Sequence, residues 1–223
     1  MTRWEEGDGF HRLVTPSGRL TAKRVIVATN GYTPEDVSAR HAGRLLPALS
    51  SVIVTRPLTD AERQAQGWTS HVMAYDSRIL LHYFRLLPDG RFLFGGRGGT
   101  DASNAGHAPQ RQRLIAHFHA MFPAWKDVEI THYWRGFVCL TADRLPYVGA
   151  LDEKKSVWTS IAYHGNGVAL ATWSGRALAQ TMMGRDAHIP APMKNRLAKF
   201  PFASLRPLYL KGAYLWYEFK DRR

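Results

Sequence analysis

The sequence is poor in cysteine and has no long apolar run. Cys139 is the only cysteine in 223 residues, so no internal disulfide can form, and we expect a reducing, cytoplasmic location. This residue lies in the apolar run 137–140, which is typical of a small buried hydrophobe rather than of a nucleophile. Nowhere do about 18 apolar residues follow one another, as a membrane span needs, so we expect no membrane partner.

Acidic residues are also few, because 18 Asp and Glu stand against 30 Lys and Arg and give a formal net charge of +12. An excess of this kind can indicate nucleic-acid binding or attraction for an anionic cofactor. The basic residues, however, are scattered singly from Arg3 to Arg223, with a mild concentration near the C-terminus. A solvated basic surface explains this distribution better, so we expect no nucleic-acid partner.

Several motifs of catalysis and metal binding are missing. There is no G-x-S-x-G, and Gly165-x-Gly167 is not completed by a third glycine as a dinucleotide fingerprint would be. His117 and His119 would diverge by about 200° on a helix, so no metal site is expected there. The glycines at 95–99 follow a strand pattern without a helix start behind them, which favours a tight loop over a phosphate cradle.

Local signals predict strands and helices in mixed order, with an antiparallel sheet inserted between the strands at Val25 and Val157. Residues 10–15 and 20–29 form a predicted hairpin across the turn 16–18. Further predicted elements are a strand at 52–56, a helix at 59–66 with Thr59 as N-cap, a hairpin of 78–86 and 91–96 across Pro88-Asp89-Gly90, a helix at 109–122, a strand at 128–140 and a C-terminal helix at 208–219.

The segment 157–184 predicts a buried strand, a glycine turn and a helix. Apolar or small residues occupy both faces of the strand, and Gly165 and Gly167 lead into a helix that Gly184 ends. The free N–H groups at its start suit an anion or a carbonyl that gains negative charge. A plain β-to-α connection explains the glycines equally well, so both interpretations stay open. The spacing places these residues on its inner face: Ala171, Thr172, Gly175, Leu178, Ala179 and Met182.

Five motifs follow one another in the order that a known family shows. They are VIVATNGY at 25–32, YFRLLPDGRFLFGGR at 83–97, WRGF at 134–137, TADRLPYVG at 141–149 and YHGNGVAL at 163–170. Together they resemble the D-amino-acid-oxidase-like superfamily of FAD-dependent oxidoreductases, most of all its gamma-glutamylputrescine oxidase type. The resemblance runs from about residue 10 to the C-terminus and implies a mixed α/β fold, in which an incomplete FAD-binding domain joins an antiparallel-sheet substrate domain.

This resemblance also implies a division of the chain. Residues 1–42 and 141–187 match parts of the FAD-binding domain, 43–140 match the substrate domain, and 188–223 form a C-terminal tail. The family's first third, with its G-x-G-x-x-G unit, has no counterpart, so we expect a C-terminal half to two-thirds of such an enzyme. We further expect apolar area to be exposed on the strands at Val25 and Val157.

The cofactor implied by the resemblance is FAD. The position of the cysteine that carries covalent flavin in some relatives falls near Gly136, so noncovalent FAD is expected. Where sarcosine-oxidase-like relatives place a lysine, this chain has Ala169, which favours a larger amine over a carboxylate-clamped amino acid. The matched cofactor-binding residues are Ala28, Thr29, Asn30, Gly31, Asp143, Gly149, Gly165, Asn166, Gly167 and Val168.

Four residues are candidates for the substrate pocket, namely Tyr83, Arg85, Trp134 and Tyr163. Their aromatic rings could exclude water, and Arg85 could hold a distal carboxylate with paired donors. Each could equally be a sheet-packing aromatic or a solvated arginine. The expected activity is oxidation of the C–N bond of a gamma-glutamylputrescine-like amine, with oxygen or another acceptor. The alternative is a truncated, non-catalytic fragment that does not bind FAD by itself.

Overall fold

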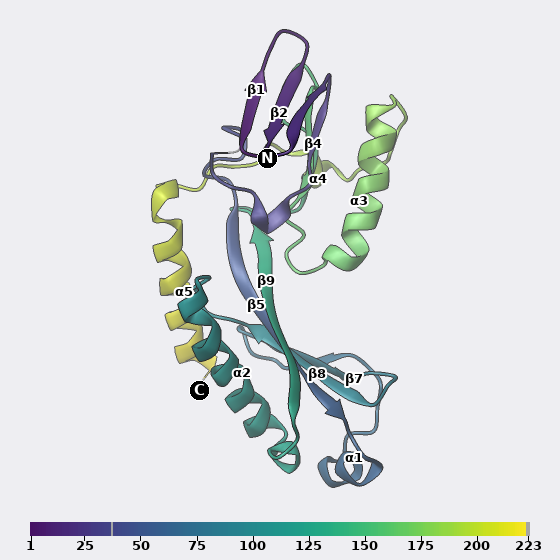
Figure 1. Ribbon diagram of the computed structural model, residues 1–223, viewed down its shortest axis with the longest axis vertical. Helices are drawn as coiled ribbons and strands as arrows, with labels where there is room; N and C mark the ends of the chain where they lie inside the picture. Colours follow the sequence, from purple (N-terminus) through teal and green to yellow (C-terminus); the bar gives the residue numbers. More distant parts are fainter. Residues whose placement is uncertain (37, 222–223) are drawn as a thin grey trace. The chain divides into compact units, whose positions relative to one another are not determined.

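The structure, a computed structural model, describes residues 1–36 and 38–221 and divides into two compact units. Unit 1 comprises Met1–Pro47 and Val138–Arg206, and unit 2 comprises Ala48–Phe137 and Pro207–Arg223. The fold is a mixed α/β fold, as predicted, and Figure 1 shows its elements coloured along the sequence. Among the helices of the described residues, none has the length and apolarity that crossing a membrane requires.

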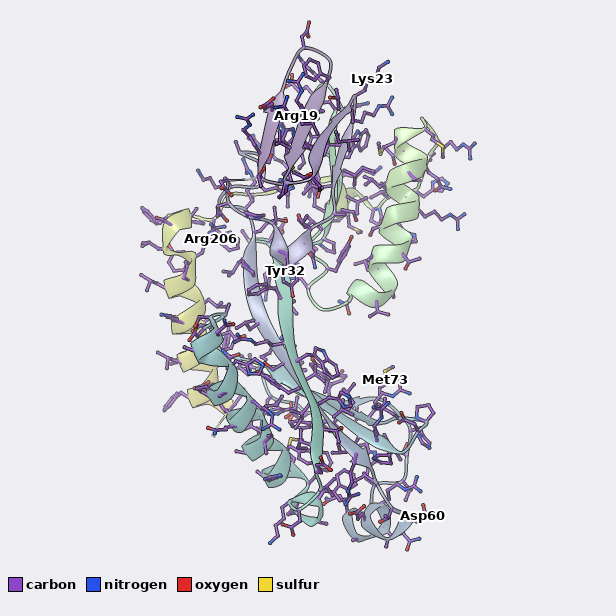
Figure 2. All side chains as sticks on the ribbon, in the orientation of Figure 1. Arg19, Lys23, Tyr32, Asp60, Met73 and Arg206 are labelled. Carbon is purple, nitrogen blue, oxygen red and sulfur yellow. The ribbon has the colours of Figure 1, made fainter. Side chains whose placement is uncertain are left out.

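Unit 1 begins with an antiparallel sheet of three strands, β1 (Arg3–Glu6), β2 (His11–Thr15) and β3 (Gly18–Ala22). The predicted turn at 16–18 is confirmed, but the predicted second strand at 20–29 is wrong. The chain leaves this sheet after Ala22, and β4 (Val25–Val27) pairs in another sheet. β3 is exposed along most of its length, and Arg19 and Lys23 point into solvent (Figure 2).

The second sheet of unit 1 has the order β10 (Tyr147–Ala150), β11 (Val157–Ile161), β4. β11 pairs antiparallel with β10 and parallel with β4, and all five of its residues are buried, as its apolar faces predicted. The expectation of exposed apolar area is therefore wrong for β11. On β4 it is confirmed by Ile26, which is 50% exposed because β4 is an end strand of this sheet.

Helix α3 (Gly167–Met182) packs against this sheet through Ala177 and Leu178, which contact Val148 and Trp158. It ends as predicted at Gly184, whose φ is +75°. The N–H groups of Gly184 and Arg185 donate to the carbonyls of Thr181 and Gln180, the pairing of a Schellman motif.

The predicted inner face of α3 is wrong in part. Thr172, Gly175 and Ala179 are exposed, whereas Ser174 and Ala177 are buried beside Leu178. Small residues occur on every side of this helix, so their spacing carries little information about which side packs.

Unit 2 contains most of a sheet of order β6 (Ala74–Tyr75), β7 (His82–Leu86), β8 (Arg91–Arg97), β5 (Leu46–Pro57), β9 (Ile130–Leu140). The pairs β6–β7, β7–β8 and β8–β5 are antiparallel, as predicted. Gly90, with φ +80°, makes the predicted turn between β7 and β8.

One face of this sheet is covered by an aromatic core. The core consists of Phe84, Phe92, Phe94, Phe118, Phe122 and Trp125.

The remaining elements of the described residues are α1 (Asp60–Gln66), α2 (His107–Met121), α4 (Ala191–Lys194), α5 (Arg206–Asp221) and the short 3₁₀ turns Asn30–Tyr32, Asn104–Gly106, Pro123–Trp125 and Ala203–Leu205. Thr59 caps α1 in a capping box with Glu62, which confirms the predicted cap.

Candidate functional site

The carboxyl ends of β4 and β11 meet at one edge of their sheet, because the two strands are parallel neighbours. We call this the β4/β11 edge and define it by the residues that follow the strands, 28–31 after β4 and 162–168 after β11. Helix α3 begins within the second of these segments. In open α/β sheets, ligands bind beyond the carboxyl ends of such strands.

Side-chain hydrogen bonds hold the loops of this edge together. The Oδ1 atom of Asn30 accepts the N–H of Ala162 at 3.0 Å, which links the two segments. Thr141 lies with its Oγ1 3.0 Å from Nε2 of His164 and donates to the carbonyl of Leu145 at 2.8 Å. A third loop, residues 141–145, is therefore tied to the same edge.

The backbone around the β4/β11 edge is strained. Four residues other than glycine have left-handed φ angles here, namely Asn30 at +46°, Arg144 at +60°, Ala162 at +64° and His164 at +55°. Such conformations cost on the order of 1–3 kcal/mol each and persist where surrounding structure over-determines them, often at functional sites. Arg and Ala rarely adopt this conformation, and Asn and His adopt it more often than other residues but still uncommonly, so the strain was not predicted.

The start of α3 offers unpaired backbone donors. Asn166 is the N-cap residue but makes no side-chain capping bond. By helix geometry the N–H groups of Gly167, Val168 and Ala169 then have no partner within the helix. Val168 is 97% exposed, so this end of the helix is open. The donors and the positive dipole end fit a flavin ring carbonyl that gains negative charge on reduction.

Most of the predicted cofactor-binding residues lie at the β4/β11 edge. Ala28 and Thr29 are exposed, Gly31 is buried, and Gly165 has φ +104° in the turn before α3. Asp143 accepts the N–H of Leu145 at 3.1 Å and so shapes the loop tied to this edge. Gly149 differs, because it pairs with Thr159 inside the sheet, two positions back from the Tyr147–Ile161 pair at the edge.

Tyr163 also belongs to this edge, since it follows the end of β11. Its hydroxyl donates to the carbonyl of Ser160 at 3.0 Å and lies 2.8 Å from Oγ of the same residue. The ring lies close to Gly167, where an added Cβ would be 3.6 Å from Cδ2 of Tyr163. These contacts fix the ring beside the start of α3.

In unit 2, the three predicted substrate residues share the sheet face opposite the aromatic core. Tyr83 and Arg85 alternate with the core residue Phe84 on β7, and Trp134 follows the core-packed Tyr133 on β9. Trp134 is 48% exposed. Because β8 and β5 lie between β7 and β9, Tyr83 and Trp134 are not neighbours on this face.

Tyr83 has a fixed position on that face. An added Cβ at Gly95 would lie 2.3 Å from the Tyr83 ring, so the ring lies directly over this glycine. The Tyr83 hydroxyl is 2.9 Å from Oγ of Ser50, a partner that the sequence did not reveal. Nε of Arg85 is buried and has no hydrogen-bond partner within residues 1–36 and 38–221.

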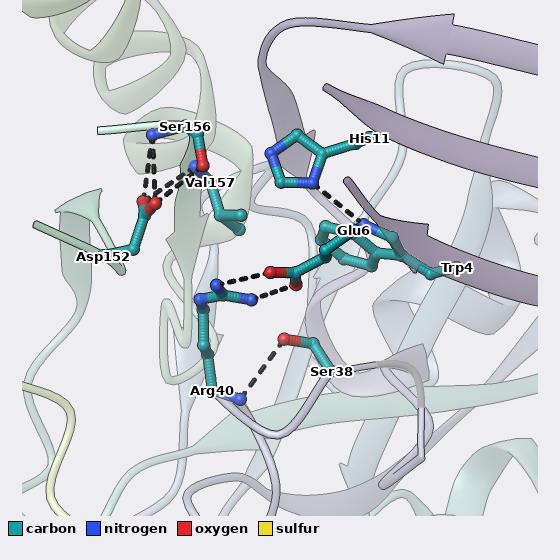
Figure 3. A network of polar contacts seen from close by, with 8 residues as sticks. All are labelled: Trp4, Glu6, His11, Ser38, Arg40, Asp152, Ser156 and Val157. Atoms are coloured by element: carbon teal, nitrogen blue, oxygen red, sulfur yellow. Dashed lines mark hydrogen bonds and ion pairs between the residues drawn. The ribbon is translucent and has the colours of Figure 1, made fainter. Parts of the chain in front are cut away.

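A polar network that sequence analysis missed supports the strands of unit 1 (Figure 3). Asp152 accepts the N–H groups of Ser156 and Val157 and the Ser156 hydroxyl, at 2.6–3.3 Å, and so closes the turn into β11. Burial alone would raise the pKa of Asp152, but these hydrogen bonds lower it overall. Glu6 and Arg40 form a two-pronged ion pair, and this hydrogen bonding lowers the pKa of Glu6.

Cys139 is buried, and burial raises the pKa of its thiol to about 12. It is therefore not a nucleophile at neutral pH, in agreement with the prediction. Within the described residues, no group of three or more His, Cys, Asp or Glu could hold a metal ion.

Comparison with known proteins agrees with this arrangement. The family model DAO, described as FAD dependent oxidoreductase, matches residues 1–181. The probable oxidoreductase OrdL of Rhizobium meliloti (strain 1021) is 32% identical over 225 residues, which cover 98% of this chain and 49% of that protein. The gamma-glutamylputrescine oxidoreductase of Escherichia coli (strain K12) is 30% identical over 220 residues, which cover 93% of this chain and 48% of that protein.

Solved structures show the same fold. The crystal structure of glycine oxidase from Geobacillus kaustophilus superposes with a TM-score of 0.67 at 19% identity and covers 89% of this chain and 51% of that one. The chain thus spans about half the length of the curated relatives it matches. The family match over residues 1–181 and the relatives at 30% identity and above agree, and the chain belongs to the DAO family of FAD dependent oxidoreductases.

Proposed function

We propose that this chain supplies the flavin-ring side and the substrate sheet of an FAD-dependent oxidoreductase that oxidises the C–N bond of an amine. The observation that carries the proposal is the open start of α3 at the β4/β11 edge, held in place by the bond between Asn30 and Ala162. In this proposal residues 1–42 and 141–187 belong to the cofactor side, residues 43–140 to the substrate side, and residues 188–223 to a C-terminal tail.

When bound, FAD supplies the redox chemistry, since it takes a hydride equivalent from the amine and passes electrons to oxygen or another acceptor. The chain's own residues would hold and orient the flavin ring and the substrate. The N–H groups of Gly167, Val168 and Ala169 stabilise negative charge at the ring. The loops at 28–31 and 165–168, with Asp143 and Gly149, would line the cofactor. Residue 136 is glycine and Cys139 is buried, which supports noncovalent FAD.

For the substrate, we propose a gamma-glutamylputrescine-like amine. The relative from Escherichia coli carries that substrate in its name, at 30% identity. Arg85 has an unpaired Nε suited to a distal carboxylate, and Tyr83, Trp134 and Tyr163 provide aromatic walls. Residue 169 is alanine at the position where sarcosine-oxidase-like relatives have a lysine, so this chain lacks the side chain that would bind the carboxylate of a small amino acid. The single, buried cysteine supports a cytoplasmic location.

A second candidate is a truncated, non-catalytic fragment that does not bind FAD by itself. Two observations favour it, namely the share of about half of the relatives' length and the absence of G-x-G-x-x-G from the sequence. In that case the ring contacts at α3 are present, but the part that holds the pyrophosphate is not in this chain.

One experiment separates the candidates. The amide signals of Gly167, Val168 and Ala169 are followed by NMR while FAD, or lumiflavin as a ring without phosphates, is added to the 223-residue chain. We expect both to shift these signals. Asn166→Asp should weaken the shifts, because a carboxylate at the N-cap repels a negative ring. Asn166 makes no side-chain capping bond that the substitution could remove. Asn195→Asp adds the same charge at an exposed residue outside the β4/β11 edge and is the matched control.

The same samples are then offered an amine panel with peroxide and dye-acceptor detection. Turnover of gamma-glutamylated amines supports the oxidoreductase. Absent shifts together with no turnover support the fragment, which does not bind FAD by itself. Shifts that are equal in Asn166→Asp and wild type would contradict the assignment of the flavin ring to the β4/β11 edge.

A further inference from the structure

Unit 2 contains a charged cavity on the helix-covered side of its sheet, away from the face that carries Tyr83 and Arg85. Its volume is about 430 Å³. Strands β7 and β8 and helices α2 and α5 contribute to its wall. The residues that define it are Arg78, Arg97, Arg113, His117, Glu218 and Asp221.

A chain of hydrogen bonds leads into this cavity. Oδ2 of Asp76 lies 2.7 Å from Nδ1 of His82, and Nε2 of His82 lies 2.9 Å from Nδ1 of His117. His82 is only 3% exposed and stacks on Phe94. A Cβ at Gly96 would come within 3.0 Å of Cδ2 of His82, so glycine there makes room for the imidazole.

This chain determines what His117 presents to the cavity. A neutral His82 that donates Nδ1–H to Asp76 can only accept at Nε2, so His117 donates its Nδ1–H. Nε2 of His117 is then an acceptor, and it has no partner among the residues the structure describes. The site therefore offers an acceptor to a ligand that carries a proton.

The cavity also holds a cation that no carboxylate neutralises. Asp221 accepts the N–H groups of Ile79 and Leu80, each at 2.9 Å, and Glu218 pairs with Arg113 at 3.0 Å. The guanidinium of Arg97 has no hydrogen bond or ion pair within residues 1–36 and 38–221. Tyr214, on the same face of α5 as Glu218, is 8% exposed, and its buried hydroxyl is likewise unpaired there.

The charges around His117 favour an anion as well. Burial, with the nearby charges of Arg113 and Arg78, lowers the pKa of His117 to about 4, and Asp76 offsets this only in part. A bound anion would reduce this positive potential and so raise the pKa of His117.

We propose that this cavity is a binding site for hydrogen phosphate. The ion brings both of the groups that the cavity lacks: anionic oxygens for Arg97 and a P–O–H donor for Nε2 of His117. Sulfate carries the same charge and shape without the proton. A phosphate monoester is fully deprotonated at about pH 8 and lacks it too. The cavity is therefore expected to select inorganic phosphate over both.

The test is calorimetric titration of the 223-residue chain at about pH 8 with phosphate, sulfate and methyl phosphate. Phosphate should bind at least about tenfold more tightly than either of the others, since each lacks one charge-assisted hydrogen bond. Arg97→Gln should weaken phosphate binding by about tenfold or more. Arg91→Gln, which removes the same charge from the arginine that begins β8, should leave it unchanged.

A second measurement does not depend on a variant. Titration of the wild-type His117 ring signal by NMR should give a pKa that sulfate raises more than the same concentration of phosphate does, because the P–O–H donor requires an unprotonated Nε2. His117→Leu should make the affinities for phosphate and sulfate nearly equal. Equal affinities in the wild type, or equal effects of Arg97→Gln and Arg91→Gln, would overturn the proposal.

Discussion

Units 1 and 2 bury their apolar side chains in different ways. Unit 2 gathers its aromatic rings into one cluster, in which Phe92, Phe94, Phe118 and Trp125 are fully buried. Unit 1 divides its buried residues among three separate clusters and adds polar clamps such as Asp152 between them. The stability of unit 2 therefore rests on ring packing, and that of unit 1 depends more on hydrogen bonds and protonation.

The largest effect is expected from Phe92→Ala. This ring contacts Phe122, Trp125 and Phe118 and is fully buried, so its removal leaves a cavity in the single core of unit 2. The free energy of unfolding, measured by urea denaturation, should fall by about 3–5 kcal/mol. Trp134→Ala, on the opposite face, is the control and should change it by about 0.5 kcal/mol or less. A loss below about 1 kcal/mol in Phe92→Ala would remove the contrast between the units.

Protonation should act on unit 1 through His41. This ring is buried, neither nitrogen has a hydrogen-bond partner among the described residues, and burial, with Arg40 and Arg44, lowers its pKa to about 4. In the unfolded chain the pKa is about 6.5. The unfolded state thus binds the extra proton between these values, and stability is lost as the pH falls from about 6.5 to about 4.

The loss attributable to His41 should reach about 3 kcal/mol at pH values below its folded pKa. It is measured as the difference between the wild-type and His41→Leu unfolding free energies across the pH range. The exposed His188, changed to Gln, serves as the control. A wild-type pH profile parallel to that of His41→Leu would contradict the expectation.

The hydrogen bonds by which Asp152 closes the turn into β11 are tested by the substitution Asp152→Asn. The carboxylate accepts bonds from the backbone of Ser156 and Val157 with both oxygens, whereas an amide has one acceptor oxygen. We expect a loss of about 1.5–3 kcal/mol at neutral pH, and a smaller difference in acid, where the wild-type carboxyl is also protonated. Asp186→Asn changes an exposed carboxylate and should have little effect. Equal effects of the two substitutions would show that the clamp does not stabilise β11.

The smallest effect is expected at the cap of α1 in unit 2. Thr59→Ala removes the acceptor for the N–H of Glu62 and should cost about 1 kcal/mol. Thr59→Ser keeps that oxygen and should retain most of the stability. Because this helix lies outside the aromatic core, a loss as large as that of Phe92→Ala would show that unit 2 does not rest on ring packing alone.

The sequence predicted those features whose cause is local. Thr59 as an N-cap, the Pro88-Asp89-Gly90 turn and Gly184 each act within a few residues, and the structure has all three. The buried β11 was predicted because both of its faces are apolar or small. At the β4/β11 edge, the glycine turn was predicted from the local pattern, whereas Asn30 was identified through the resemblance to a family.

Features that depend on distant partners were not predicted. β4 is only three residues long and gains its place by pairing with β11, more than a hundred residues away, so the local pattern merged it with β3. The partners Ser50 of Tyr83 and Ser156 of Asp152 differ from other serines only in their surroundings. His41 and the chain from Asp76 to His117 are likewise defined by burial, which the sequence does not show at a single position.

The contact between Tyr83 and Gly95 has a consequence for redesigning the substrate face. A methyl group at residue 95 would overlap the ring at 83, so the two positions cannot be varied one at a time. In a mutant library that randomises only residue 95, most variants would have the Tyr83 ring displaced from its present position. One that pairs a small residue at 83 with a larger one at 95 would move the bulk from one strand to its neighbour and open space where the phenol ring now lies.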